Sequence, residues 1–155
     1  MMKKYLFIIN LIIILTGISV LPAISINVFE KYDKVIWINQ HKQIGVAYEG
    51  GQKVWEFPVL TGDDETTTNP GIYVVKLKDD SYFSRKYDTW MPYSIFFDLK
   101  NRKAIHEGVV PQPQARKAYA THGCIHVESP FIERLYDWAD EGTTVVVIQG
   151  WRDED

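Results

Sequence analysis

The sequence predicts a mainly β, single-domain fold with one clear helix packed on its sheets. Two observations lead to this prediction. From residue 30 onward, most segments are short runs of β-branched and aromatic residues separated by polar turns, which is typical of strands. Only one segment, near the C-terminus, has apolar residues at helical spacing. The length of 155 residues, with 46% hydrophobic and 24% charged residues, suits one globular domain.

The first three expected strands form a meander at the start of this domain. They span residues 34–39, 43–48 and 54–60. Between the second and the third, Glu49-Gly50-Gly51-Gln52 predicts a two-residue hairpin turn, because glycine tolerates the positive φ that such turns need. Pro58 indicates that the third strand is an edge strand or carries a bulge, since proline cannot donate to a sheet ladder.

Four more strands are expected, at residues 72–78, 92–99, 103–107 and 143–149. A polar loop at 61–71 precedes them, and residues 79–89 are charged and irregular. A long loop at 108–120 contains Pro111 and Pro113. Long loops in compact domains are often functional.

The predicted helix follows Ser129, a suitable N-cap, and has Pro130 at its first position. Gly142 is a natural stop signal. One apolar stripe would face the sheets: Phe131, Ile132, Leu135, Tyr136 and Ala139.

Residues 1–25 are expected to be a targeting segment. Lys3 and Lys4 provide a positive start, residues 5–21 are largely apolar, and small residues follow at 23 and 25. The alternative is an uncleaved anchor, because residues 5–28 are nearly long enough to span a bilayer. Both readings place a domain at residues 30–150 outside the cytoplasm, in the periplasm or cell envelope, either free or anchored to the inner membrane. Membrane contact is expected only through this segment.

Charge and cysteine content narrow the function classes. The net charge is −3 and no Lys/Arg cluster occurs, which argues against a nucleic-acid partner. Cys124 is the single cysteine, so an internal disulfide is excluded. A lone thiol in an oxidising compartment is expected to be either buried or used.

The sequence around this cysteine, Thr121-His122-Gly123-Cys124-Ile125-His126, is the densest in reactive groups. If extended, it would place His122, Cys124 and His126 on one face. An imidazole can take the thiol proton and so activate the sulfur as a nucleophile. Gly123 would leave room for a substrate carbonyl, and the amides nearby could stabilise an oxyanion.

His106 ranks first as the base, because it ends its own strand and can face the thiol from a neighbouring strand. Two alternatives stay open at this point. The thiol can be a small buried hydrophobe. The H-x-C-x-H pattern with His106 also has ligand types suited to zinc. Residue types and spacing place a nucleophilic site only slightly ahead of a metal site.

His106, then fourteen residues, then Thr121-His122-Gly123-Cys124-Ile125 resembles the signature of the L,D-transpeptidases, the YkuD-type catalytic domain. Further segments are similar to that family over roughly residues 34–149: Thr61-Gly62 with residues 68–73, residues 90–93, and residues 142–148. The resemblance implies a β-sandwich-like fold with the cysteine in a cleft beneath a mobile lid, for which residues 79–91 are the candidate.

The resemblance also implies an activity. Cys124 would attack the carbonyl that follows the L-centre of the diamino acid at position three of a peptidoglycan stem. The terminal D-Ala would leave, and an amine on a second stem or a wall-linked protein would accept the acyl group, giving a 3–3 cross-link. His106 would move the proton, oriented by the Glu107 carbonyl. The family needs no metal or cofactor, and carbapenems acylate its cysteine.

The residues expected to bind substrate, besides the catalytic Cys124 and His106, are Thr121, His122, Gly123, His126 and Tyr93. Two positions depart from the family pattern. His126 stands where Arg or Asn is usual, and Glu107 stands where a small residue is common. The alternatives on this fold are an L,D-carboxypeptidase, an enzyme that detaches a protein from the wall, and an inactive wall-binding module.

Overall fold

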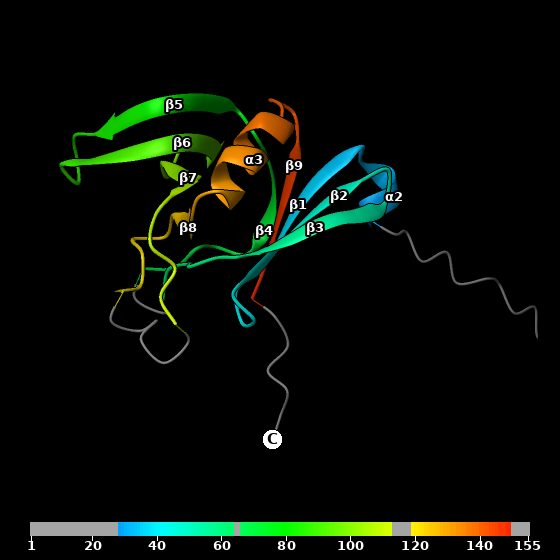
Figure 1. The fold of residues 1–155 in the computed structure, drawn as a ribbon, viewed down its shortest axis with the longest axis horizontal. Helices are drawn as coiled ribbons and strands as arrows, with labels where there is room; N and C mark the ends of the chain where they lie inside the picture. Colours follow the sequence, from blue (N-terminus) through cyan, green and yellow to red (C-terminus); the bar gives the residue numbers. More distant parts are fainter. Residues whose placement is uncertain (1–27, 64–65, 113–118, 150–155) are drawn as a thin grey trace, which may run out of the picture.

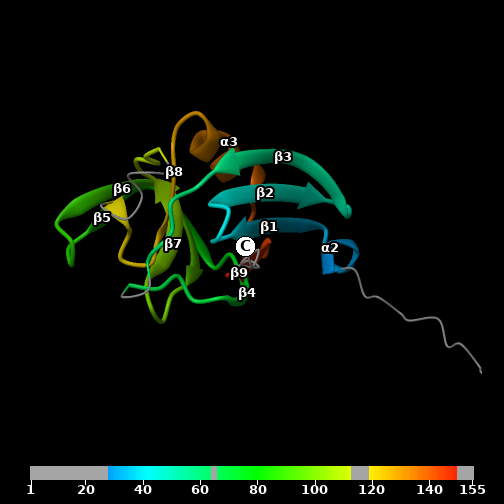
Figure 2. The same cartoon turned by 90° about the horizontal axis from the view of Figure 1, so that it is seen from below.

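Two β-sheets and one helix form the core of the structure, a computed structural model that describes residues 28–63, 66–112 and 119–149. The first sheet has the order β3-β2-β1-β9-β4 and the second the order β5-β6-β7-β8. Figures 1 and 2 show the sheets side by side, with α3 between them at one end. The elements are α2 (Val28–Lys31), β1 (Lys34–Asn39), β2 (Ile44–Glu49), β3 (Gln52–Pro58), β4 (Gly71–Val74), β5 (Leu77–Ser84), β6 (Thr89–Asp98), β7 (Lys103–Glu107), β8 (Ile125–Val127), α3 (Phe131–Trp138) and β9 (Thr144–Ile148).

The first sheet begins with the predicted meander. β1 pairs with β2 and β2 with β3, both antiparallel, while β9 joins β1 in parallel. Gly50 and Gly51 form the two-residue turn with φ of 56° and 79°, so the hairpin prediction is confirmed. β3 is an edge strand, as Pro58 indicated.

The predicted strand at 72–78 is wrong, because the chain changes sheets within it. β4 pairs with β9 in the first sheet, and β5 pairs with β6 in the second. The crossing lies at Val75 and Lys76, whose N–H groups donate to Thr143 in one direction and to Phe96 in the other. Residues 79–89, expected to be irregular, mostly belong to β5 and the turn that follows it.

The helix is shorter than predicted. α3 starts at Phe131 with Pro130 as its N-cap, and it ends at Trp138, four residues before Gly142. Ser129 does not cap it; its hydroxyl donates instead to Glu107 Oε1 at 2.8 Å. Ile132, Leu135 and Ala139 of the expected stripe are buried in the core between the sheets, whereas Phe131 remains partly exposed.

The fold class predicted from the sequence is confirmed: two sheets, mainly β, with one helix packed against them. The core contains side chains from both sheets and α3: Ile36, Ile38, Phe57, Ile95, Ile105, Ile125, Ile132, Leu135, Val145 and Val147 among others. Among residues 28–63, 66–112 and 119–149, no helix is long and apolar enough to cross a bilayer. The predicted targeting segment at 1–25 lies outside the described residues.

Candidate active site

Cys124 immediately precedes β8, the short strand that pairs in parallel with β7. The register places His106 of β7 opposite His126 of β8. Two strands far apart in the sequence therefore bring an imidazole and the thiol to one edge of the second sheet. Residues 122–126 would share one face only in an extended segment, and that condition is not met, because Gly123 has a φ of +93° and turns the chain just before the strand.

Gly123 is required by close packing. A Cβ at this position would lie 2.2 Å from Lys103 Nζ and 2.8 Å from the Thr67 carbonyl oxygen. The positive φ also favours glycine. Lys103 Nζ donates to the His122 carbonyl at 2.6 Å, so the ammonium lies directly beneath this turn. The expected open space for a substrate carbonyl beside Gly123 is therefore occupied by protein.

Hydroxyl groups hold the turn in shape. Thr121 Oγ1 is buried; it accepts from the Gly123 N–H at 3.0 Å and donates to the Cys124 carbonyl. The hydroxyl of Thr66 donates to the Thr121 carbonyl at 2.6 Å, and that of Thr68 to the Gly123 carbonyl at 3.1 Å. The Gly123 amide is thus engaged with Thr121 rather than directed at a substrate oxyanion. Lys103, Thr66 and Thr68 were not predicted, since only the fold places them beneath this turn.

His106 is a buried, oriented imidazole. Its Nδ1 lies 2.7 Å from the Glu107 carbonyl oxygen, as the resemblance implied. A carbonyl only accepts, so Nδ1 carries the proton and Nε2 is left as the acceptor. Burial first, and then the neighbouring His126, lower the pKa of His106, while the bond to Glu107 acts in the opposite direction; together they bring that pKa to about 4. His106 is therefore neutral at pH 7 and able to accept a proton.

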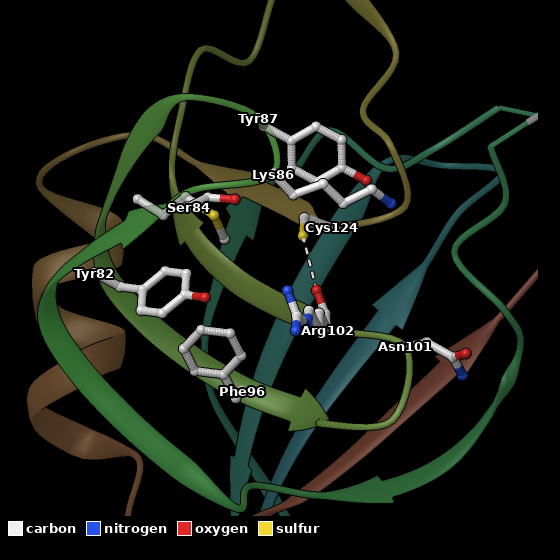
Figure 3. Close-up of a pocket in the computed structure, with 9 residues that line it drawn as sticks. Tyr82, Ser84, Lys86, Tyr87, Phe96, Asn101, Arg102 and Cys124 are labelled. Carbon is white, nitrogen blue, oxygen red and sulfur yellow. Dashed lines mark hydrogen bonds between the residues drawn. The ribbon is translucent and has the colours of Figure 1, made fainter.

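Cys124 is a largely buried thiol, 9% exposed, and it lines two cavities. Figure 3 shows the smaller of these two. Its Sγ lies 3.8 Å from the Arg102 carbonyl oxygen. Because that oxygen only accepts, the contact requires an S–H donor. Burial raises the pKa of Cys124, while the Ala104 backbone and the charge of Lys103 act in the opposite direction. The resting pair is therefore a thiol and a neutral imidazole rather than an ion pair.

His106 and Cys124 line one cleft of about 460 Å³, together with Tyr87, Thr89, Trp90, Met91, Glu107, Gly108, Ala120, Thr121, His122 and His126. The Cys124 hydrogen bond goes to Arg102, so proton transfer requires the thiol to turn toward the imidazole. Such catalytic contacts commonly tighten only when substrate is bound.

The remaining predicted residues divide into those inside and outside the cleft. The His122 ring stacks on Tyr87, with centroids 4.8 Å apart. The His126 ring lies 4.7 Å from that of His106, and burial lowers its pKa. Tyr93, expected to bind substrate, does not line the cleft; its ring packs 5.7 Å from Tyr136 of α3.

Within the described ranges, no three His, Cys, Asp or Glu side chains are grouped so that they could hold a metal ion. The zinc alternative therefore lacks a set of converging ligands there. His122 turns to Tyr87 while the sulfur turns to the Arg102 carbonyl, so the H-x-C-x-H side chains point in different directions.

The lid candidate at 79–91 folds as the β5–β6 hairpin. Tyr87 at its tip reaches the cleft and contacts His122. The hairpin therefore covers one side of the site, and its mobility stays a prediction.

Comparisons with known proteins agree with this geometry. Residues 33–148 match the family model of the L,D-transpeptidase catalytic domain. An L,D-transpeptidase structure from Stackebrandtia nassauensis is similar at 26% identity and a TM-score of 0.69, over 81% of this chain and 59% of that one. One from Xylanimonas cellulosilytica is similar at 26% identity and a TM-score of 0.65, over 76% of this chain and 61% of that one. A further L,D-transpeptidase, in complex with imipenem, shares the fold at 14% identity and a TM-score of 0.64, over 76% of this chain and 59% of its own. The chain spans about three fifths of the length of these structures.

Proposed function

This chain belongs to the L,D-transpeptidase (YkuD) catalytic domain family, and from that premise we propose that it is a cysteine-dependent acyltransferase acting on peptidoglycan stem peptides. The donor is a stem tetrapeptide, and the acceptor is an amine on a second stem or a wall-linked protein. The enzyme works in the cell envelope, delivered there by the segment at residues 1–25.

One observation carries the proposal: Cys124 and the neutral, oriented His106 line the same cleft. Neither residue is typical of a purely structural site in this arrangement. A buried structural histidine does not need to line a cleft of about 460 Å³, and neither does an inert thiol. The pair has the base and the nucleophile that acyl transfer requires.

The chemistry follows from the protonation states. His106 Nε2 takes the proton of the Cys124 thiol as the sulfur attacks the carbonyl carbon of the scissile amide. The C–N bond then breaks, His106 returns the proton to the leaving amine, and a thioester to Cys124 remains. An incoming amine attacks the thioester, a new amide forms and the sulfur recovers its proton. Water in place of the amine would give a carboxylic acid and L,D-carboxypeptidase activity.

Electrostatics favour a general-base step over a preformed thiolate. The pKa of His106 is lowered to about 4 and burial raises that of Cys124, so the proton rests on sulfur at neutral pH. A bound substrate that excludes water and aligns the thiol with Nε2 is then needed to start the reaction. This arrangement protects a lone thiol from oxidation, because the thiolate is the reactive form.

The test is product analysis with a purified stem tetrapeptide as the only substrate. Mass spectrometry is expected to find dimers cross-linked between third residues, together with released D-Ala. Cys124→Ala should form neither product. Tripeptide without dimer would show that the same site is a carboxypeptidase, and an unchanged tetrapeptide would contradict the proposed activity.

A further inference from the structure

A second cavity also reaches Cys124, and it contains no histidine (Figure 3). Its volume of about 40 Å³ exceeds the ~10–15 Å³ that one water needs, so it has room for a small polar group. It shares Tyr87, Met91 and Cys124 with the His106 cleft. Its other lining residues are Tyr82, Ser84, Lys86, Phe96, Asn101 and Arg102. Cys124 thus lies between two compartments with different linings.

The two compartments differ in charge. The His106 cleft is lined by Glu107 and by no lysine or arginine. The second cavity is lined by Lys86 and Arg102 and by no carboxylate. Among the residues that the structure describes, neither of these cations has a carboxylate within ion-pair distance; Lys86 instead lies over the Tyr87 ring, 4.8 Å from its centroid. In a chain with a net charge of −3, this concentration of unpaired positive charge beside the nucleophile favours an anionic ligand.

Arg102 is placed for contact with such a ligand. Figure 3 shows its guanidinium extending into the space between Tyr82, Phe96 and Cys124, while Asn101 points away. Its backbone has a φ of +53°, a conformation that favours glycine or asparagine over a long side chain. The same residue accepts the Cys124 S–H through its carbonyl. A guanidinium offers paired N–H donors in the geometry that a carboxylate accepts.

The position of the base sets the direction of the donor. His106 must return a proton to the leaving amine and later face the incoming amine, so both amines occupy the His106 cleft. The acyl side of the donor then lies across Cys124 from that cleft, where the end of one of its side chains fits the small second cavity. A groove of about 530 Å³ shares Tyr82, Phe96 and Arg102 with this cavity and adds Arg85, again without a carboxylate.

We propose that Arg102, assisted by Lys86, binds a carboxylate on the acyl side of the donor, so that the enzyme selects stems whose third residue is a diamino acid with a side-chain carboxylate. This deepens the proposed function and rests on it. The burial of His126 supports the assignment, because burial lowers the pKa of that imidazole and leaves it neutral at pH 7, without the charge that would hold a carboxylate.

The experiment compares tetrapeptide donors that differ in one carboxylate. One carries meso-diaminopimelate at position three, the second carries lysine there, and the third keeps diaminopimelate but has the carboxylate of its second residue amidated. Affinity is measured by calorimetry on Cys124→Ala protein, and kcat/KM is measured on the protein with its cysteine. Arg102→Gly removes the guanidinium and keeps the backbone, because glycine accepts the positive φ. Lys100→Gln, in the same turn but outside the cavity lining, is the matched control.

The diaminopimelate donor should bind roughly ten- to a hundredfold more tightly than the lysine donor, the range of one charge-assisted pair. Arg102→Gly should abolish that preference, and Lys100→Gln should retain it. Loss of affinity on amidation of the second residue instead would assign the pocket to that carboxylate and overturn the selection of the third residue. Equal affinity for all donors, or an unchanged preference in Arg102→Gly, would overturn the carboxylate site. If the enzyme turns over the donors but binds them equally well, this inference alone is refuted. If it binds the diaminopimelate donor more tightly than the lysine donor but turns over neither, the proposed function alone is refuted.

Discussion

Replacing Gly123 with alanine tests how tightly the nucleophile's turn is built. The new Cβ would lie 2.2 Å from Lys103 Nζ and 2.8 Å from the Thr67 carbonyl oxygen. Lys103 must therefore move and lose its 2.6 Å bond to the His122 carbonyl. The backbone must also keep a φ of +93° with a side chain attached.

Gly142 separates these two costs. Its φ of +97° nearly equals that of Gly123, but a Cβ there would meet nothing within 4 Å. Gly142→Ala thus measures the conformational cost alone, about 1–3 kcal/mol. Gly123→Ala should cost about 1–3 kcal/mol more, since it also loses a partly exposed charged hydrogen bond and forces a shift of the Thr67 backbone.

Urea denaturation of the two variants gives the difference directly from their free energies of unfolding. Lys103→Ala combined with Gly123→Ala should recover part of the excess, because the nearest clash is gone. Equal destabilisation by Gly123→Ala and Gly142→Ala would refute the packing argument. The packing argument would also be refuted if the double variant lost as much unfolding free energy as the two single variants lose together.

Two further predictions concern the same site. The pKa of His106 is lowered to about 4 in the folded protein. As the pH falls below about 6.5, the unfolded chain binds a proton at His106 while the folded protein does not. The protein therefore loses stability between about pH 6.5 and pH 4. Urea denaturation at pH 7 and at pH 4.5 gives the decrease in the free energy of unfolding between the two pH values. This decrease should be smaller by roughly 2–3 kcal/mol in His106→Gln than in the unchanged protein. An identical decrease in both proteins would contradict the burial argument. Thr121→Val leaves the Gly123 N–H and the Cys124 carbonyl without their partner and should cost about 2–4 kcal/mol. Thr121→Ser keeps the hydroxyl and should retain most of the stability, and equal melting of the two variants would dismiss a role for that hydroxyl.

Local signals in the sequence predicted the elements that local chemistry determines. Two strands, residues 34–39 and 103–107, have the predicted bounds, and the paired glycines at 50 and 51 form the predicted turn. The candidate pair was predicted because Cys124 is the single cysteine and because His106, at the end of its own strand, matches the family signature together with residues 121–125. These features need no knowledge of distant contacts.

The errors occurred where long-range pairing decides the structure. Nothing local at Val75 marks the change of sheet, because the hydrogen bonds that produce it come from Thr143 and Phe96. The charged residues of β5 are strand-forming only because β6 pairs along their length. The same holds for Arg102, whose carbonyl meets the Cys124 thiol only after β7 and β8 have paired.

The turn before β8 also could not be predicted from the sequence alone. Alternating His122, Cys124 and His126 predicted one shared face, but the φ of Gly123 breaks the alternation. The glycine was noticed for its small size, and its positive φ depends on Lys103 and the threonine hydroxyls beneath it. Tyr93 was assigned to the site through sequence similarity, and only the packing of α3 shows that its ring faces the core.

Intact-mass spectrometry during incubation with imipenem tests most directly whether Cys124 is a nucleophile that His106 activates. The protein should gain the full mass of one imipenem, since opening the β-lactam releases no fragment, and peptide mapping should locate the adduct at Cys124. The rate should fall by about a hundredfold or more in His106→Gln, the usual loss when a general base is removed. No adduct, an adduct on another residue, or an unchanged rate in His106→Gln would contradict the account.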